Sequence, residues 1–439
     1  MYDLRIINGV VYINNKYKNT NIYITDGIIK EITPDSFDAL NTYDCNGDLV
    51  FPGIIDPHTH FELDLGHISS RDTFYTGTKA GALGGVTTII DFLEPVNNSD
   101  ALVEAFYKRK EQAKDSVIDY KFHACLKNPK NEVIPITVKM KHLGLNTVKI
   151  FTTYSDSNRR TYDPEIIQLL QHSVSGDYMV TAHIENDILI QTNKEDHYRD
   201  LPLNRPTISE SSEAIKLAKY VKQTNGYLYM VHCSSGQTLK QLRHEFSDIL
   251  NKNFIIESCP HYFMFNNEVL NREDGYLYTM APPLRSEQER ILLTQQIDDV
   301  FTIGTDHCSF NKKDKQVNKL CDMPLGVSGI GESFDIMFSI FGDTIIDKMT
   351  KNVAIAHKLY PQKGTIQIGS DADLFIYHLE DTKLNTLKGN TDYSIYQDIM
   401  VRGTVSSTLS RGNFIVKNGL FLGGKGRLLN KCGDYCESD

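Results

Sequence analysis

The chain has 439 residues, of which 40% are hydrophobic and 23% charged, the composition of an ordinary globular protein. Its 46 basic and 56 acidic residues give a formal charge of −10 without a basic cluster, which argues against a nucleic-acid partner. No apolar run reaches ~18 residues and the first residues alternate like a strand instead of resembling a signal peptide, so we expect a cytoplasmic protein without a membrane span.

Cysteine spacing gives little evidence of disulfides. The eight cysteines are scattered, and several lie in or beside strand-like segments, which indicates reduced thiols. Cys432 and Cys436 near the end could form a metal or disulfide pair, but we interpret them as part of a frayed tail.

The first 50 residues carry short alternating strands separated by turn residues. Asn-Gly, Asn-Asn and Asp-Gly pairs favour tight hairpins, because Asn and Gly tolerate positive φ. The predicted strands of this small β layer are Leu4–Ile7, Val10–Ile13, Asn21–Ile24 and Ile28–Ile32.

From residue 50 onward, apolar strands alternate with helical patterns. The predicted strands are Val50–Ile55, Val86–Asp91, Tyr120–Leu126, Thr147–Phe151, Tyr178–His183, Tyr227–His232, Phe254–Ser258 and Phe301–Thr305. The predicted helices include Thr73–Leu83, Ala101–Ala113, Pro164–His172, Glu210–Lys222, Gly236–Phe246 and Glu287–Ile297. This alternation predicts an α/β fold with a (β/α)8 TIM barrel, in which catalytic groups lie at the carboxyl ends of the strands.

After about residue 362 the β pattern returns, in 363–377, Val401–Ser410 and Arg411–Val416. A chain of this length exceeds the size at which one core keeps growing, so a second, smaller domain is expected. We expect residues 51–362 to form the barrel domain, and residues 1–50 and 363–439 to form one discontinuous β domain.

Two histidines follow the first predicted barrel strand, in Asp56-Pro-His-Thr-His60. Side chains two apart in an extended chain point to the same face, so His58 and His60 can bind one metal ion. Alone, the pair is as readily explained as two solvated or core histidines. The residues at the ends of the other strands decide between a metal site and two ordinary histidines.

Ionisable residues end four further strands, and each has an ordinary explanation when considered alone. A strand histidine can be hydrogen-bonded in the core, a lysine can pair with a carboxylate, and an aspartate can cap a helix. Their convergence on one barrel mouth predicts two divalent ions instead. His58, His60 and Asp306 would bind one ion, and His183 and His232 the other, with Lys149 between them.

An ammonium group at Lys149 would repel both ions, so this lysine can bridge them only if CO2 has converted it to a carbamate. A water between ions ~3.5–4 Å apart becomes hydroxide near neutral pH. Asp306 could take its proton and deliver it to a leaving amine. His307 is a candidate for orienting Asp306 or a ligand.

The remaining histidines are interpreted more simply. His67 and His261 either line the mouth or lie in solvated loops, and His123 is a core or supporting residue.

Over nearly its whole length the sequence resembles the amidohydrolase superfamily, and within it the cyclic amidases: hydantoinase, dihydropyrimidinase, allantoinase and dihydroorotase. The motifs that carry the resemblance are Asp56-Pro-His-Thr-His60, Gly84-Gly-Val-Thr-Thr-Ile-Ile-Asp-Phe92, Ala182-His-Ile-Glu-Asn186, Val231-His-Cys-Ser234, Ala281-Pro-Pro-Leu-Arg285 and Gly304-Thr-Asp-His-Cys308. The resemblance implies a barrel with a small β-sandwich, two ions that are most often zinc, and a carboxylated Lys149.

Tyr154 follows Lys149 by five positions, similar to the hydantoinase and dihydropyrimidinase arrangement in which a tyrosine hydroxyl stabilises the oxyanion. A packed tyrosine at the rim is the alternative. The resemblance therefore implies opening of a dihydropyrimidine or 5-substituted hydantoin ring, with Asp306 as general base and acid.

Three departures leave the substrate open. Ala281 stands where hydantoinases have serine, and Leu325 stands where they have asparagine. The segment Cys259-Pro-His-Tyr262 is more similar to allantoinases and dihydroorotases. A cyclic ureide hydrolase is therefore the first alternative function, and a non-catalytic scaffold protein is the second. The resemblance also implies a homodimer or homotetramer, with the segment Gly423–Leu429 between subunits.

Overall fold

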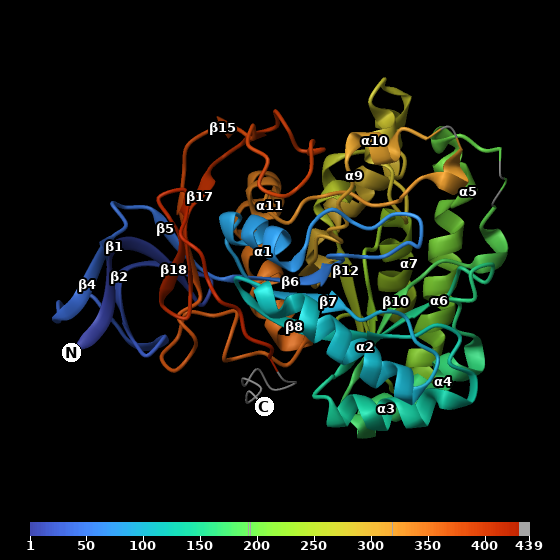
Figure 1. Ribbon diagram of the computed structural model, residues 1–439, viewed down its shortest axis with the longest axis horizontal. Coiled ribbons are helices and arrows are strands. Elements are labelled where there is room, and N and C mark those ends of the chain that lie inside the picture. Colours follow the sequence, from blue (N-terminus) through green and yellow to red (C-terminus); the bar gives the residue numbers. More distant parts are fainter. Residues whose placement is uncertain (192, 194, 318, 430–439) are drawn as a thin grey trace.

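The computed structural model describes residues 1–191, 193, 195–317 and 319–429, so Cys432 and Cys436 lie outside the described residues. Figure 1 shows a β layer at one end of the molecule and a helix-covered barrel at the other. The first and last parts of the chain, blue and red in the figure, lie side by side in the β layer. No helix of the described residues is long and apolar enough to cross a membrane.

The β layer contains a nine-stranded sheet in the order β19-β18-β17-β14-β5-β1-β2-β3, with β4 paired to β1. β5 joins the two ends of the chain, because it pairs parallel with β1 and antiparallel with β14. The strands are β1 (Tyr2–Ile13), β2 (Lys16–Thr25), β3 (Ile28–Thr33), β4 (Ala39–Asp44), β5 (Leu49–Pro52), β14 (Leu374–His378), β17 (Thr404–Ser410), β18 (Asn413–Lys417) and β19 (Leu420–Phe421). A separate pair, β15 (Thr382–Lys383) and β16 (Met400–Val401), lies outside this sheet.

The predicted hairpin at Asn8-Gly9 is wrong, because β1 runs through it as one strand. Asn8 has φ 54°, and the pairing of β1 with β2 shifts register between Ile6 and Gly9. The left-handed residue therefore forms a β-bulge and does not reverse the chain. The strand β4 was not predicted.

Eight parallel strands form the second sheet, in the order β13-β12-β11-β10-β9-β8-β7-β6. Their residues are buried almost throughout, as expected for strands covered on both faces. They are β6 (Ile54–Thr59), β7 (Val86–Phe92), β8 (Asp119–Cys125), β9 (Thr147–Phe151), β10 (Met179–His183), β11 (Leu228–Met230), β12 (Phe254–Ser258) and β13 (Thr302–Ile303).

Gly53 divides the predicted strand Val50–Ile55 between the two sheets. Its N–H donates to the carbonyl of Asp373 at 2.8 Å, and a Cβ at this position would lie 2.2 Å from Thr87 Oγ1. The chain therefore leaves the β layer after β5 and enters the barrel at β6. As a consequence His58 lies inside β6, not in a turn after the strand.

The barrel closes between β6 and the segment that follows β13. His60 N–H donates to the His307 carbonyl at 2.8 Å, and Thr59 bridges His307 in parallel. Below this point the Asp56 carboxylate accepts hydrogen bonds from Thr305 N–H at 3.1 Å and from Thr305 Oγ1 at 2.5 Å. The Asp56 side chain thus replaces some of the backbone hydrogen bonds that the short strand β13 cannot make with β6.

Helices surround the barrel, and several were not predicted, including α3 and those after β13. They are α1 (Phe74–Leu83), α2 (Ser99–Gln112), α3 (Val133–His142), α4 (Asp163–Gly176), α5 (Leu201–Asn204), α6 (Thr207–Thr224), α7 (Gly236–Phe246), α8 (Pro260–Met264), α9 (Glu287–Gln295), α10 (Lys312–Lys315), α11 (Ser333–Phe341), α12 (Ile346–Met349) and α13 (Lys351–Ala356).

Two contacts hold the β layer against the barrel. Phe51 of β5 packs on Phe334 of α11, with ring centroids 5.5 Å apart. Lys363 is buried and lies 2.7–2.8 Å from the carboxylates of Asp119 at the start of β8, Asp371 and Asp373. We propose that residues 1–50 and 363–439 act as one domain and residues 51–362 as the other, with the Lys363–Asp119 ion pair between them and β5 crossing the boundary.

Candidate metal centre and active site

A cavity of about 250 Å³ opens at the carboxyl ends of the barrel strands. All seven residues predicted for the site line this one cavity: His58, His60, Lys149, Tyr154, His183, His232 and Asp306. They come from strands β6, β9 and β10 and from the segments after β6, β9, β11 and β13. The barrel therefore brings together residues separated by up to 248 positions, because parallel strands all end at the same face.

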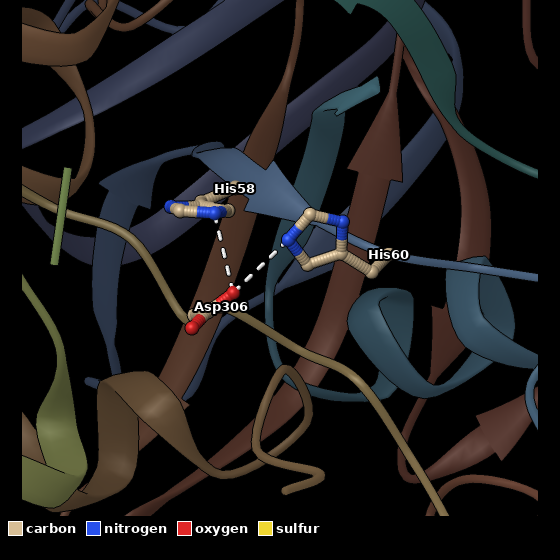
Figure 2. A group of neighbouring side chains, drawn as sticks. All are labelled: His58, His60 and Asp306. Atoms are coloured by element: carbon tan, nitrogen blue, oxygen red, sulfur yellow. Dashed lines mark ion pairs between the residues drawn. The ribbon is translucent and has the colours of Figure 1, made fainter. Parts of the chain in front are cut away.

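His58, His60 and Asp306 form the first group of possible ligands. Figure 2 shows both imidazoles directed at the Asp306 carboxylate. The Oδ1 atom of Asp306 lies 3.2 Å from His58 Nε2 and 3.1 Å from His60 Nε2. Burial opposes ionisation of Asp306, but the two rings hold its pKa well below the ordinary value. A carboxylate and two imidazoles are a donor set that zinc accepts.

Glu257, near the end of β12, fixes the orientation of His58. Its Oε1 accepts from His58 Nδ1 at 2.8 Å and from His232 N–H at 3.0 Å, and its Oε2 accepts from Tyr229 OH at 2.7 Å. The proton of His58 is therefore on Nδ1, and the Nε2 lone pair faces Asp306. Such carboxylate partners are typical of histidines that bind metals.

His183 and His232 form the second group. The two rings approach with His183 Nδ1 3.0 Å from His232 Nε2. Glu185 accepts from His183 Nε2 at 2.6 Å, so that Nδ1 of His183 carries a lone pair directed at its neighbour. Burial lowers the pKa of both histidines, to about 4 for His183, which keeps them neutral as metal ligands must be.

Lys149 lies in the middle of β9, is buried and lines the same cavity as the two groups. Its Nζ lies 5.0 Å from the centroid of the Phe92 ring and 5.6 Å from that of Phe151. Among the described residues no carboxylate or carbonyl accepts a hydrogen bond from it. Burial lowers the pKa of Lys149 to about 8, so the neutral amine is accessible near neutral pH.

The donor atoms fit a binuclear metal centre. Within the described part of the chain, the buried Nε2 of His58 makes no hydrogen bond, and His183 and His232 direct nitrogens at each other. Buried polar groups normally have partners, and a cation bound here would give the unpaired nitrogen of His58 one. His58, His60 and Asp306 would hold one ion, and His183 and His232 the other.

Tyr154 and Arg205 extend the second group toward the cavity wall. Arg205 Nη2 donates to Tyr154 OH at 3.0 Å, and the guanidinium also pairs with the Glu185 carboxylate. Burial raises the pKa of Tyr154, so its hydroxyl keeps the proton. The tyrosine can therefore donate a hydrogen bond into the cavity.

Three of the cavity residues have left-handed backbone conformations: Tyr154 (φ 69°), His232 (φ 42°) and Asp306 (φ 50°). This region is uncommon for residues other than glycine and costs of order 1–3 kcal/mol each where the surroundings hold it. The backbone strain thus coincides with the side chains that the cavity assembles.

The other histidines do not join the site. His307 hydrogen-bonds Asp72 Oδ2 at 3.0 Å and accepts from Gly329 N–H at 3.2 Å, so it holds loops together and does not orient the Asp306 side chain. His123 is a buried supporting residue bonded to Thr147 Oγ1 at 2.7 Å. His67 is exposed and His261 is buried, and neither lines the cavity.

Sequence reasoning missed the supporting residues Glu257, Glu185 and Arg205. A signal for Glu257 was present, because a carboxylate inside the apolar run Phe254–Ser258 requires a buried partner. Glu185 was visible only as part of Ala182-His-Ile-Glu-Asn186, and Arg205 carried no local signal. Ala281 and Leu325, the two departures from the hydantoinase motifs, both line the cavity, where they can affect which substrate it accepts.

Comparison with known proteins gives consistent results. A model described as "Amidohydrolase family" matches residues 49–415. A D-phenylhydantoinase of Escherichia coli O81 (strain ED1a) is 30% identical over 456 residues, which cover 97% of each chain. The crystal structure of a dihydropyrimidinase from Brevibacillus agri NCHU1002 aligns with a TM-score of 0.90 at 28% identity, covering 100% of both chains.

A D-hydantoinase (dihydropyrimidinase) from Thermus sp. aligns with the same TM-score of 0.90 and 28% identity, covering 97% of this chain and 98% of that one. These similarities confirm the predicted fold, a TIM barrel with a β-sandwich.

Proposed function

The chain belongs to the amidohydrolase family, and from that membership we propose that it is a hydrolase of cyclic amides that opens a dihydropyrimidine or 5-substituted hydantoin ring. The observation that carries the proposal is the convergence of the proposed metal ligands and Tyr154 on one cavity. The relatives named above, D-phenylhydantoinase and dihydropyrimidinase, support this substrate class.

Two divalent ions, which we propose to be zinc, would supply an activated hydroxide at neutral pH and polarise the amide carbonyl. Hydrolysis consumes one water: its oxygen joins the carbonyl carbon, the C–N bond breaks, and the ring nitrogen gains one of its protons. The other proton is released to solvent, so the product carries a new carboxylate. The protein must therefore hold the ring, move one proton and stabilise the negative charge that develops on the carbonyl oxygen.

Asp306 is the proposed proton carrier. It reaches the cavity from the segment after β13, between His58 and His60, which keep it ionised and ready to accept a proton. The same carboxyl group then returns that proton to the ring nitrogen as it leaves.

Tyr154 is the proposed oxyanion donor. Its hydroxyl bonds Arg205, which in turn is fixed by Glu185. A donor that is positioned before the reaction costs no reorganisation when the charge develops. Arg205 also places a positive charge beside the phenol, in a position to favour the negative transition state.

Lys149 is the proposed bridging ligand, after carboxylation by CO2. The reaction requires a neutral amine, which burial favours, and the carbamate replaces a repulsive cation by an anion. We expect Lys149→Ala to bind fewer than two ions and to lose activity, and bicarbonate not to restore either. Full activity in this variant would refute the bridging role.

The segment Cys259-Pro-His-Tyr262 favours one alternative, hydrolysis of allantoin, dihydroorotate or another cyclic ureide. Ala281 and Leu325 line the cavity, so the ring that it accepts can differ from that of the relatives. A non-catalytic scaffold is the remaining alternative. We also propose a homodimer or homotetramer, which light scattering can test. In this structure the segment 423–429 pairs with its own chain, where Leu429 N–H donates to the Tyr120 carbonyl at 2.8 Å.

The deciding experiment measures ring opening by the purified protein, loaded with zinc and bicarbonate, on dihydrouracil, hydantoin, a 5-aryl hydantoin, allantoin and dihydroorotate, with metal content determined in parallel. Turnover of the first three with two ions bound is expected. Turnover of only the last two would replace the proposal by the alternative. A protein without metal and without turnover would be a scaffold.

A further inference from the structure

Arg159 is a charged side chain of the cavity that has no part in the proposed chemistry. Arg159 lines the cavity from the loop after β9, the same loop that carries Tyr154. The backbone ties the two residues together, because Arg159 N–H donates to the Tyr154 carbonyl at 3.0 Å. Arg159 is half-buried, so part of its hydration is already lost before a ligand binds.

Among the residues that the structure describes, no carboxylate lies within ion-pair distance of Arg159, and no acceptor hydrogen-bonds its side chain. The other arginines around this cavity differ: Arg109 pairs with Asp91, Arg160 with Asp187 at 3.1 Å, and Arg205 with Glu185. A partly desolvated charge without a partner is costly, and an anionic ligand would compensate it.

The position of Arg159 places this charge on the wall and not among the metal ligands. It acts electrostatically on Tyr154 and on Cys125, the last residue of β8, and opposes the rise in pKa that burial causes in both groups. Apolar side chains, including Phe151 and Leu325, line the same cavity. A ring held with its carbonyl at Tyr154 would therefore direct a substituent toward Arg159.

We propose that Arg159 binds a carboxylate on the exocyclic substituent of the substrate, so that the preferred substrates are cyclic amides with a short acidic side chain. The inference rests on the proposed function, because it assumes that the ring occupies this cavity. An arginine presents a planar pair of donors that matches a carboxylate in a bidentate manner.

Besides Asp306, the acidic residues Asp64 and Glu94 of the cavity oppose this preference without removing it. Asp64 accepts from Gly66 N–H at 2.7 Å and so caps its own loop. Glu94 lines the cavity outside ion-pair distance of Arg159. Glu94→Gln should therefore strengthen the preference for an anionic substrate by a smaller factor than Arg159→Gln weakens it.

The test compares two hydantoins of equal size, 5-(2-carboxyethyl)hydantoin and 5-(2-carbamoylethyl)hydantoin, through the ratio of their kcat/KM values. Hydrogen bonds to charged groups predict a ratio of about tenfold to a hundredfold in favour of the carboxylate. Arg159→Gln should bring the ratio close to one. Arg160→Gln removes the same charge one residue away, outside the cavity lining, and should leave the ratio unchanged.

Charge reversal gives a second variant, for which the expected result is a gain of activity instead of a loss. Arg159→Glu should turn over 5-(4-aminobutyl)hydantoin faster than the wild type and reject the carboxylate. A wild-type ratio near one, or an unchanged ratio in Arg159→Gln, would overturn the inference.

Calorimetric binding of the two hydantoins to metal-depleted protein separates this inference from the proposed function. Absence of turnover on every cyclic amide would refute the function, whereas a binding preference that depends on Arg159 would still support the anion site. Equal binding of both compounds by wild type and variant would refute the anion site alone.

Discussion

Replacing Glu257 by glutamine tests how the first metal position is built. Glutamine keeps the shape of the side chain, and its oxygen can still accept from His58 Nδ1 and His232 N–H, the two bonds of 2.8 and 3.0 Å. What it loses is the negative charge. Burial raises the pKa of Glu257 to about 7, and a cation held by His58 favours the ionised carboxylate.

The number of hydrogen bonds that lose a charged acceptor gives the expected loss of metal affinity. Hydrogen bonds to charged groups contribute ~1 kcal/mol more than neutral ones, so two such bonds amount to ~2 kcal/mol. This energy corresponds to about a thirtyfold loss of metal affinity, within the range of ~10 to 100-fold typical of groups that support a ligand.

The assay is metal content at equilibrium with buffered free zinc, accompanied by the melting temperature of the metal-depleted protein. Glu213→Gln is the matched control, since Glu213 is buried on α6 beside Lys216 and outside the cavity lining. Unchanged zinc affinity in Glu257→Gln would show that the carboxylate does not determine how His58 presents its lone pair.

Tyr154→Phe should lower kcat by ~10² to 10³-fold with little change in KM, the cost of removing one oxyanion donor; a change confined to KM would instead assign the hydroxyl to ground-state binding. Burial opposes ionisation of Asp72, yet its hydrogen bonds to His307 and Ser309 lower its pKa to about 2, below the unfolded value of ~3.9. The ionised carboxylate therefore stabilises the folded protein above pH ~4, and this stabilisation is lost as the pH falls toward 2. Melting temperatures of Asp72→Asn should therefore fall less steeply than those of the wild type between pH 5 and 3, and parallel curves would contradict this assignment. Lys363→Met leaves three buried carboxylates without their common cation and should lower the free energy of unfolding by ~3–5 kcal/mol, measured with denaturant. Lys358→Met removes an exposed ion pair with Asp177 and should lower it by ~1 kcal/mol or less. Equal effects of the two substitutions would argue against burial as the cause.

Regular elements with strong patterns could be predicted from the sequence. The bounds of β9, β12 and α7 are confirmed, because apolar runs and an amphipathic period mark them clearly. The failures occurred where local signals have two meanings. Asn8-Gly9 permits a bulge as well as a hairpin, and Gly53 marks a strand break only because Thr87 lies against it in space.

The candidate site could be predicted to the extent that it follows strand ends. The strands of a barrel all end at one mouth, so residues toward those ends lie close together. For this reason we could predict His58, Lys149, His183 and Asp306. The partners that orient them could not be found in this way. Glu257 lies 199 residues from His58, and only the folded chain shows that the two share a hydrogen bond.

The place of β5 between β1 and β14 has a consequence for protein synthesis. The N-terminal strands can pair with one another as soon as they leave the ribosome, but β14 begins at residue 374, long after β5 ends at residue 52. At ~5–20 residues per second, β5 waits roughly 15 to 65 s with one edge unpaired. The nascent chain thus carries an open strand edge throughout synthesis of the barrel, and a chaperone that binds such edges would act in this interval.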